Sequence, residues 1–457
     1  MDKVKEDKLV IILGCLVLFC IQILGNMVTL AIPSISQDFH MNVDLTNAVS
    51  LIYLVLVISL VLPLAKIISK YGVGKFLKIG ISLGIISLIV CAISPNSTIF
   101  LIGRAFQGIS SALICCSINL ILYLQLSGED FGKSIGIVLS AGYVGLALSY
   151  LFAGIITYYL SWRILFLSLM LLYIVAFFIL MKLDKEWFLK KDISIDYRDS
   201  IIYSILMILF VGFMSNLDFG GIYILPICLV LLIIFVWLEK NIEYPLYNIK
   251  LLKNPDYIVG NFSSFVVFFT TFIVMYVLNF YLQYALDYNS YMTGLFLLPA
   301  AIVMIIFAYI AGKLTVKYDL RLLSVVGCII LIIAGYIIFK MDFIPIYQIF
   351  IGCIVLGIGE GFFLASNNKQ VGQTIDSENF IDSSSFLFTN RELGKTISLS
   401  IYFVVAGLML GSDSSFDDAV LKLIMTGETM MEISIVLLIT AIILLFVMWL
   451  RKKYIKA

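Results

Sequence analysis

Long apolar runs separated by short polar segments extend along the whole chain of 457 residues. A helix needs about 20 apolar residues to cross the ~30 Å hydrocarbon core of a bilayer. Runs of this length recur from end to end, and spans are expected at residues 9–32, 44–65, 76–94, 97–124, 134–159, 163–181, 200–217, 221–238, 257–283, 291–312, 322–340, 344–366, 384–411 and 432–450. The segments between them are too short for a soluble domain. The pattern therefore predicts an all-helical integral membrane protein with fourteen transmembrane helices.

The amino-acid composition agrees with this pattern. Hydrophobic residues make up 62% of the chain and charged residues 13%, with a mean hydropathy of +1.10, whereas soluble domains are nearer half apolar and a quarter charged. The first run is longer than a signal-peptide core, and Pro33 follows it without a small-residue cleavage site, so a retained span is expected. A net charge of +1 gives no reason to expect a nucleic-acid partner.

The basic residues lie mostly in alternate connecting segments. One side collects 26 lysines and arginines, including those of both termini, and the other side collects three, namely Arg163, Lys340 and Lys422. Cytoplasmic loops of membrane proteins carry the excess of Lys and Arg. Both termini are therefore expected in the cytoplasm, which requires an even number of spans.

Cysteine and histidine give little sign of chemistry. All eight cysteines fall inside expected spans, and their spacing fits neither a disulfide framework nor a metal site, so they are interpreted as small buried thiols. The single histidine, His40, lies in an outer segment where a solvated position is expected. No metal and no cofactor are expected, and the absence of a Walker sequence argues against an ATP-driven pump.

Two short sequences of the first half recur in the second half. "AKIISKYGVGKFL" (65–77) resembles "GKLTVKYDLRLL" (312–323) at an offset of 247 residues. "IGRAFQGISSA" (102–112) resembles "IGCIVLGIGEG" (351–361) at an offset of 249 residues, with two glycines in common. The agreement between the offsets predicts an internal duplication.

The duplication predicts three parts. These are an N-terminal six-helix bundle (1–181), an inserted helix pair with its cytoplasmic flanking loops (182–256) and a C-terminal six-helix bundle (257–457). Each copy has an even number of spans, so both run in the same direction through the membrane. Parallel repeats of this kind are related by a pseudo-twofold axis along the membrane normal, and the substrate site lies near the midplane between them.

Several motifs occur in the order that is typical of one transporter family. They are "AIP" (31–33), "LIGRAFQGISSA" (101–112) with Arg104, Gln107 and Gly108, "SGEDFGKSIG" (127–136), "LSWRILF" (160–166) and "NRELGKTISLSI" (390–401). Over nearly its whole length the chain resembles the fourteen-span drug:proton antiporters of the major facilitator superfamily, the EmrB/QacA type. The resemblance implies the major facilitator fold and proton-coupled efflux of drugs.

Some positions depart from that family. Ala65 replaces the usual Gly of the loop after the second span, and Ser69 with Lys70 replaces its Asp-Arg pair. The acidic residue typical of the first span is missing, because Leu24 is the nearest position and Asn26 the closest polar side chain. Proton coupling must therefore use another carboxylate, or be absent.

Arg104 places a permanent charge inside an apolar run. A charge at mid-bilayer costs at least ~2.5 kcal/mol, so it normally faces the interior of a helix bundle or a water-filled cavity. One interpretation is a tether between helices. The resemblance implies the other, in which Arg104 lines the central cavity and takes part in coupling. Gln107, at i+3 on the same side of the helix, is placed to orient it.

The duplication also predicts a second coupling residue, Glu360. This residue aligns with Ser111, seven residues after the position of Arg104, and seven residues are nearly two full helix turns. Glu360 is therefore expected on the helix face that Arg104 occupies in the first copy. Desolvation favours the neutral form of a carboxyl group, which suits proton loading. The hypothesis is that Glu360 is a displaced coupling carboxylate, and the alternative is a structural acid.

Other polar residues are weaker candidates. Those that line the cavity or hydrogen-bond neighbouring helices are Asn26, Tyr143, Asn261, Asn279 and Gln283. Those of the basic loops, which the resemblance connects with gating and which otherwise anchor the chain, are Lys66, Ser69, Lys70, Lys313 and Lys317. Arg391 and Glu392 begin a span and are expected to form an interfacial ion pair.

No catalytic constellation is present, so a transporter is expected rather than an enzyme. The predicted function is secondary active, proton-coupled multidrug efflux by alternating access, by a monomer in the cell membrane that confers drug resistance. The expected partners are a small amphipathic substrate, protons and membrane lipid. One alternative is a specific metabolite or peptide transporter, with or without ion coupling. Another is a non-transporting membrane sensor built on a transporter fold.

Overall fold

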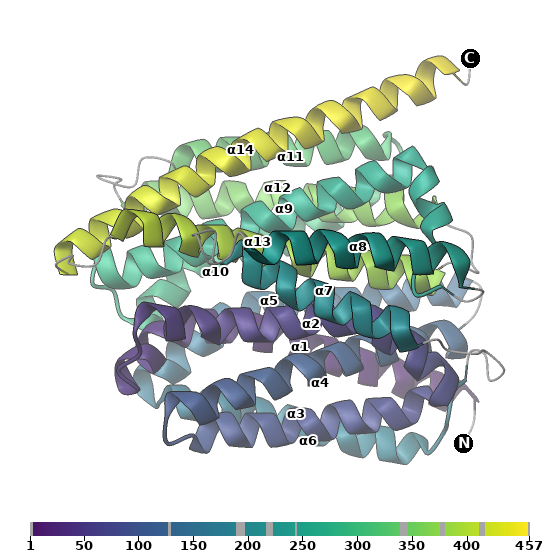
Figure 1. Ribbon diagram of the computed structural model, residues 1–457, viewed down its shortest axis with the longest axis horizontal. Coiled ribbons are helices and arrows are strands. Elements are labelled where there is room, and N and C mark those ends of the chain that lie inside the picture. The colour runs from purple at the N-terminus through teal and green to yellow at the C-terminus, as the bar shows by residue number, and fades with distance from the viewer. Residues whose placement is uncertain are drawn as a thin grey trace. The chain divides into compact units, whose positions relative to one another are not determined.

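α-Helices dominate the structure, a computed structural model that describes residues 3–126, 129–188, 197–215, 223–242, 245–338, 346–374, 380–410 and 416–455 (Figure 1). In these ranges the helices are α1 (Lys3–Asp38), α2 (Val43–Tyr71), α3 (Val73–Ile93), α4 (Ser97–Gln125), α5 (Glu129–Tyr159), α6 (Trp162–Leu183), α7 (Tyr197–Met214), α8 (Ile224–Asn241), α9 (Pro255–Phe280), α10 (Ser290–Leu314), α11 (Leu320–Ile338), α12 (Ile346–Gly372), α13 (Phe380–Leu410) and α14 (Phe416–Ile455). A short 3₁₀-helix (Ile249–Lys253) precedes α9, and a π-helical turn (Tyr281–Ala285) extends it. The described residues contain no strand, as an all-helical fold requires.

Thirteen helices in the described part of the chain are long and apolar enough to cross a membrane. The exception is α13, whose first half carries Arg391, Glu392 and Lys395. The helices also exceed the predicted apolar runs. α1 begins at Lys3 rather than at residue 9, and α2 ends at Tyr71 rather than at residue 65. The prediction of an all-helical, fourteen-helix membrane fold is confirmed.

Asparagine side chains fix the start of several helices. Asn42, Asn96 and Asn289 each accept a hydrogen bond from the backbone N–H three residues later, at 3.0, 3.0 and 2.9 Å. Asn254 caps α9 in a similar way, and Pro255 follows as the first helical residue. These caps satisfy N–H groups that have no partner within the helix, so the polar segments between spans define where each helix begins.

The turn between α2 and α3 depends on a glycine and on a carboxylate from far along the chain. Gly72 has a φ of +112°, a conformation that favours glycine. The Glu186 carboxylate, just beyond α6, accepts hydrogen bonds from the backbone N–H groups of Gly74 (2.6 Å) and Lys75 (3.0 Å). Because a negative charge stabilises a helix N-terminus, Glu186 fixes the start of α3.

The described helices form two compact units. The first unit comprises the described residues of 1–212 and 223–247, and the second those of 213–222 and 248–457. In the first unit α7 packs on α2, where Tyr203 Oη donates to the carbonyl oxygen of Ile58 at 3.1 Å. Most of the inserted helix pair thus groups with the first unit, while the division at residues 181/182 and 256/257 stays a prediction.

The same pairs of helices pack together in both units. In the first unit α1 packs on α5, α2 and α3 pack on α4, and α3 packs on α6. In the second unit α9 packs on α13, α10 and α11 pack on α12, and α11 packs on α14. Each helix of α1 to α6 therefore has a counterpart with equivalent neighbours in α9 to α14.

Individual contacts recur at the offsets that the sequence predicts. A Cβ on Gly108 would lie 2.8 Å from the carbonyl oxygen of Tyr53 in α2, and a Cβ on Gly357 would meet the carbonyl oxygen of Ala300 in α10. The two glycines are 249 residues apart and the two carbonyls 247. The duplication was inferred from a few letters, and the packing contacts confirm it.

The first helix of each copy follows an offset of 246 residues. A Cβ on Gly145 would lie 2.6 Å from Phe19 O, and a Cβ on Gly394 would lie 2.5 Å from Phe265 O. In addition, α1 packs on α4, and α9 packs on α12. These four glycine-lined contacts allow residues of the two copies to be compared position by position.

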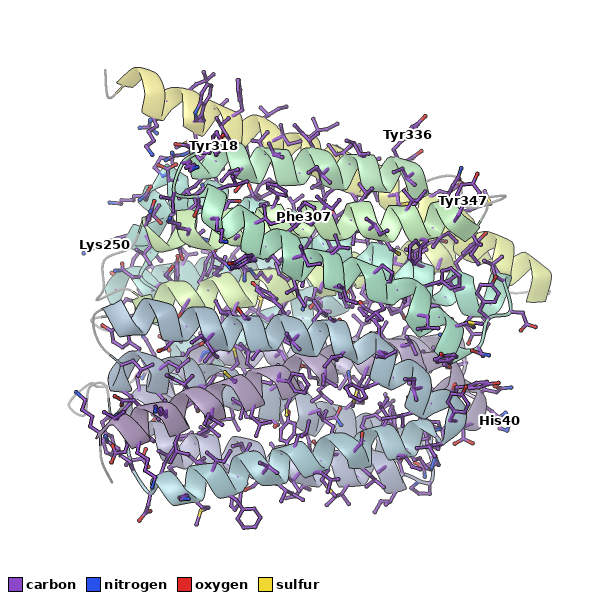
Figure 2. The ribbon with its side chains drawn as sticks, turned by 180° about the vertical axis from the view of Figure 1, so that it is seen from behind. His40, Lys250, Phe307, Tyr318, Tyr336 and Tyr347 are labelled. Atoms are coloured by element: carbon purple, nitrogen blue, oxygen red, sulfur yellow. The ribbon has the colours of Figure 1, made fainter. Side chains whose placement is uncertain are left out.

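The helices of the second unit alternate in direction. Lys250, before α9, and Tyr318, between α10 and α11, lie at one end of the helices in Figure 2. Tyr336, near the end of α11, and Tyr347, in the first turn of α12, lie toward the other end. This alternation is the one that repeated membrane crossings require.

Candidate functional site

Arg104 is buried in the first unit, with 1% of its surface exposed. Its Nε donates to the carbonyl oxygen of Val49 in α2 at 2.9 Å, and its Nη1 donates to Oε1 of Gln107 at 2.6 Å. The guanidinium lies 4.6 Å from the centroid of the Tyr53 ring. A desolvated cation over an aromatic ring gains about 2 kcal/mol. The charge is thus satisfied by a carbonyl, an amide and a ring inside the protein.

The contacts of Arg104 continue into a small network. Gln107 Nε2 donates to Sγ of Cys91 in α3 at 3.3 Å, and Tyr53 Oη donates to Oγ of Ser111 at 3.3 Å. The network therefore joins α2, α3 and α4. These contacts are the ones expected of a tether between helices, and the part of Arg104 in coupling stays a prediction.

Glu360 lies half-buried on α12, at the position that Ser111 has on α4. Two cations of α13 attract its carboxylate, Lys395 more strongly than Arg391. Within the described residues, no hydrogen bond or ion pair at contact distance holds this carboxylate. Glu360 is therefore an acid inside a membrane helix whose charge is balanced from a distance.

Arg391 contacts three neighbouring side chains of the second unit. Its Nε donates to Oγ of Ser264 in α9 at 2.9 Å, and its Nη2 donates to Oδ1 of Asn368 in α12. The guanidinium lies 5.0 Å from the ring centroid of Phe268. Arg391 therefore joins α9, α12 and α13, much as Arg104 joins the helices of the first unit.

Lys395 is a residue that sequence reasoning did not single out. It pairs with Glu392 at 2.7 Å, and its ammonium lies 5.5 Å from the Phe268 ring centroid. The sequence had predicted an ion pair of Glu392 with Arg391. In the structure Glu392 pairs with Lys395 instead. The i,i+3 spacing of the two charges in "ELGK" is the signal that predicts this pair.

The polar candidates of the spans make local hydrogen bonds. Asn26 Nδ2 donates to the backbone carbonyl four residues before it at 2.8 Å, and Gln283 Nε2 donates to Oδ1 of Asn279 at 2.8 Å. Ser290 Oγ donates to Oε1 of Gln283 at 3.5 Å, and Tyr143 lies half-buried in α5. Hydrogen bonding within and between helices is thus present at these positions, and a cavity role for them stays a prediction.

The candidates for gating lie mostly in helices rather than in loops. Lys66, Ser69 and Lys70 belong to the end of α2, where Ser69 Oγ donates to the carbonyl oxygen of Lys66 at 2.7 Å. Lys313 lies in the last turn of α10, and Lys317 follows that helix. The prediction that a loop begins directly after the second span, at residue 66, is therefore wrong, because α2 continues to Tyr71.

Comparison with known proteins places this arrangement in a family. The model of the Major Facilitator Superfamily matches residues 14–399. The riboflavin transporter RibZ of Clostridioides difficile is 23% identical over 401 residues, which cover 87% of this chain and 88% of that protein. The quinolone resistance protein NorB of Staphylococcus aureus is 24% identical over 345 residues, with coverage of 73% and 74%.

Solved structures show the same fold. A bacterial homologue of the human lysosomal transporter Spinster has a TM-score of 0.68 over 97% of this chain and 96% of its own. The human organic anion transporter MFSD10 has a TM-score of 0.64, with coverage of 97% and 100%. Both are 13% identical to this chain, so their similarity concerns the fold alone. The chain belongs to the Major Facilitator Superfamily of secondary transporters and is a multi-pass membrane protein.

Proposed function

We propose that this protein exports small amphipathic compounds from the cell in exchange for protons. The position of the Glu360 carboxylate, half-buried within α12, is the observation that supports the exchange for protons. A carboxylate within an apolar helix is costly, and such residues are typical of proton relays and substrate pathways. The attraction of Lys395 and Arg391 acts on the ionised carboxylate and disappears when it is protonated.

The names of two relatives support the class of substrate. Riboflavin and the quinolones are both planar heteroaromatic compounds with polar substituents, and the relatives named after them align with most of this chain. The proposed substrates are therefore flat, amphipathic aromatic molecules. The protein moves them and makes or breaks no covalent bond in them.

The proposed mechanism is alternating access, in which Glu360 carries the proton. A ligand shifts a conformational equilibrium only by as much as its affinity for the two states differs. Protonation of Glu360 changes how strongly α12 is attracted to the cations of α13, so it supplies such a difference. Arg104 and Gln107 keep α4 fixed on α2 and α3 while the second unit responds.

The proposed orientation follows from the basic residues. With 26 of them on the side of the termini and three on the other, both termini lie in the cytoplasm. The protein acts in the cell membrane as a monomer, with each copy of the six-helix repeat crossing in the same direction.

Transport by everted membrane vesicles tests the proposal. Vesicles that contain the protein are expected to accumulate a fluorescent dye or a quinolone when an inward-acid pH gradient is imposed, and to lose it when the gradient is collapsed. The Glu360→Gln variant is expected to lose at least nine-tenths of this gradient-dependent uptake. Glu432→Gln is the matched control, since Glu432 is an exposed carboxylate of α14 in the same unit.

The outcomes separate the alternatives. Uptake that does not respond to the gradient would indicate an uncoupled transporter. Equal gradient-driven uptake by Glu360→Gln and wild type, at equal expression, would show that another group carries the proton. If no tested compound moved, the proposal of drug efflux would fail and the sensor interpretation would be favoured.

A riboflavin-type metabolite is the second candidate substrate. The relative that covers 87% of this chain is named a riboflavin transporter, whereas the quinolone resistance protein covers 73%. Counterflow of labelled riboflavin in the same vesicles distinguishes the two. Saturable exchange of riboflavin that dyes do not compete with would favour a specific metabolite transporter.

A further inference from the structure

Five polar side chains are buried toward one end of the second unit. Asn261 and Ser263 belong to α9, Asn367 and Gln370 to α12, and Thr389 to α13, and none has more than 4% of its surface exposed. We call these five residues the polar layer. Each has an oxygen atom without a hydrogen-bond partner among the described residues, and Gln370 lacks such a partner for both Oε1 and Nε2. Buried polar atoms are normally hydrogen-bonded, so the polar layer needs a partner that the described residues do not supply.

Asn367 and Gln370 of the polar layer lie beside Gly260, together with the apolar side chain of Val371. Asn367 Nδ2 donates to the carbonyl oxygen of Gly260 at 2.8 Å. Nε2 of Gln370 and Nδ2 of Asn367 lie 3.6 and 3.7 Å from the point that a Cβ on Gly260 would occupy. Asn390, next to Thr389, donates from Nδ2 to the carbonyl oxygen of Asn261 at 2.5 Å. Facing positions of α9, α12 and α13 thus meet at one place.

The first copy has an apolar junction at the same place. Gly14 corresponds to Gly260, and a Cβ on it would lie 3.6 Å from Ile118, the counterpart of Asn367. The counterparts of Asn261, Ser263, Asn367 and Gln370 are respectively Cys15, Val17, Ile118 and Ile121, while that of Thr389 is Ser140, whose hydroxyl donates to the carbonyl oxygen of Gly136. Ile118 and Ile121 are fully buried. The fold therefore does not require polar side chains here, and the second copy has them for another reason.

Water is the partner that fits the unmet atoms. The oxygens of Asn261, Asn367 and Gln370 need donors, and Nε2 of Gln370 needs an acceptor, which a water molecule supplies together. A metal cation would satisfy the oxygens alone. It would also lie near the guanidinium of Arg391, which is bonded to Ser264 and Asn368.

The polar layer lies on the route from Glu360 to the end of the unit. Asn367 and Glu360 are seven residues apart on α12, so they share a helix face about 10 Å apart. Arg391 bonds to Asn368, which follows Asn367 on α12, and it also attracts Glu360. The end in question is the one where α9 begins and α12 ends, which the basic residues predict to be cytoplasmic.

We propose that the polar layer binds a chain of ordered water molecules that conducts protons between Glu360 and the cytoplasmic end of the second unit. This inference rests on the proposed coupling role of Glu360. In the transfer, the O–H bond of the Glu360 carboxylic acid breaks and its proton adds to the nearest water. Successive transfers along the hydrogen bonds release one proton at the end, and no electron changes hands.

Other charged groups near the polar layer already have partners. On α13 they are Arg391 and the pair of Lys395 with Glu392. On α9, Asp256 pairs with Arg321 of α11 at 2.8 Å. On α12, Lys369 donates to Oγ1 of Thr315 beside α10 at 3.1 Å. Glu360 is therefore the group from which the water chain takes its proton.

Hydroxyl-radical footprinting by X-ray radiolysis tests for the water without any transport assay. Tyr257 borders the polar layer, because its carbonyl accepts from Asn261 Nδ2 at 3.0 Å, and its side chain is fully buried. Bound water is expected to give oxidation of Tyr257 in the purified protein. Phe166, equally buried on α6 in the first unit, is the control and is expected to stay unmodified.

The Gln370→Ile variant tests the proton route. It installs the residue type of the first copy at a position whose side chain makes no hydrogen bond within the described part of the chain. Gradient-driven efflux is expected to slow at least tenfold, while substrate exchange at equal pH, which needs no proton release, stays within twofold of wild type. Tyr257 oxidation is expected to fall as well. Gln370→Ser, which leaves room for water, is expected to retain gradient-driven efflux and Tyr257 oxidation.

A second exchange between copies controls for the substitution itself. Phe362→Leu introduces the residue type of its first-copy counterpart, Leu113. Phe362 packs against Phe307 rather than against the polar layer. This variant is expected to keep efflux, exchange and Tyr257 oxidation. An unmodified Tyr257 in wild type would overturn the proposal, as would wild-type efflux in Gln370→Ile.

Failure of the proposed function and failure of this inference are distinguishable. If wild type shows no gradient-driven transport but Tyr257 is oxidised, proton-coupled export fails and the proton route is overturned with it. If efflux depends on Glu360 but Tyr257 is protected, only the water chain is overturned. Oxidation that changes when sodium chloride replaces choline chloride would identify a metal cation instead of water, which also overturns the proposal.

Discussion

At the scale of single residues, a guanidinium in an apolar helix must recover inside the protein the hydrogen bonds it would make in water. Arg104 does so with the carbonyl oxygen of Val49, the amide of Gln107 and the ring of Tyr53. These partners belong to two helices, so the charge also holds α4 on α2. Loss of these contacts of Arg104 should therefore lower the stability of the first unit more directly than it changes any single transport step.

Arg104→Lys is expected to destabilise the first unit by about 2 kcal/mol, because the ammonium cannot replace both Nε and Nη1 as donors and hydrogen bonds to charged groups are worth ~1.5–3 kcal/mol. The midpoint of thermal unfolding in detergent should fall accordingly. Arg451→Lys, at the exposed end of α14, is the control and should leave the midpoint unchanged. Equal midpoints for both variants would show that Arg104 does not hold the helices together.

Sequence reasoning found Arg104, Gln107 and Glu360 because each breaks an apolar run or differs from its repeat. It did not find Asn367 or Gln370. Polar residues near the end of a span are expected to face the headgroup region, and one sequence alone does not show that α9 and α13 bury them. Their signal becomes visible only when contacts fix the alignment with Ile118 and Ile121 of the first copy.

At the scale of helices, glycines set how closely neighbouring helices approach. Gly108 and Gly357 bring α4 and α12 against backbone carbonyls of α2 and α10. Small residues at such contacts let helix backbones pack closely inside membranes. Helix length was less predictable than helix contact, because hydropathy detects only the part of a helix within lipid and not the polar turns that continue α1 and α2 beyond it.

Gly108→Ala and Gly357→Ala are each expected to destabilise the protein by about 1–3 kcal/mol, the usual cost of overpacking a close contact. Gly312→Ala, in α10, is the matched control because no atom of another described element lies within 4 Å of the added Cβ. Unfolding midpoints of the three variants measure the difference. A midpoint for Gly357→Ala as high as that for Gly312→Ala would mean that α10 and α12 separate without cost.

At the scale of the whole molecule, the distribution of basic residues predicts how the chain is inserted. The predicted spans put 26 lysines and arginines on one side and three on the other, and both termini share a side only if the number of crossings is even. The fold itself was largely predictable at this scale, since fourteen apolar runs and two matching offsets indicate the duplicated bundle. The grouping of α7 with the first unit was not, because it depends on hydrogen bonds such as that of Tyr203 to α2.

Labelling of introduced cysteines is expected to reveal this orientation. Gln37→Cys, at the exposed end of α1, should react with a membrane-impermeant maleimide in intact cells. Lys5→Cys, at the exposed start of the same helix, should react only after the cells are permeabilised. The native cysteines, of which Cys15 alone is less than fully buried, give the background. The reverse pattern of labelling would place the termini outside.

The four positions at which the copies exchange apolar for polar side chains have a consequence for how such proteins diversify. A duplicated scaffold keeps its helix contacts in both halves. One half can therefore acquire buried polar side chains that bind water, while the other keeps its apolar packing. A few amino-acid substitutions then separate a helix junction that excludes water from one that admits it. Ion coupling can on this view be gained, moved or lost among relatives without any change in the number or order of their helices.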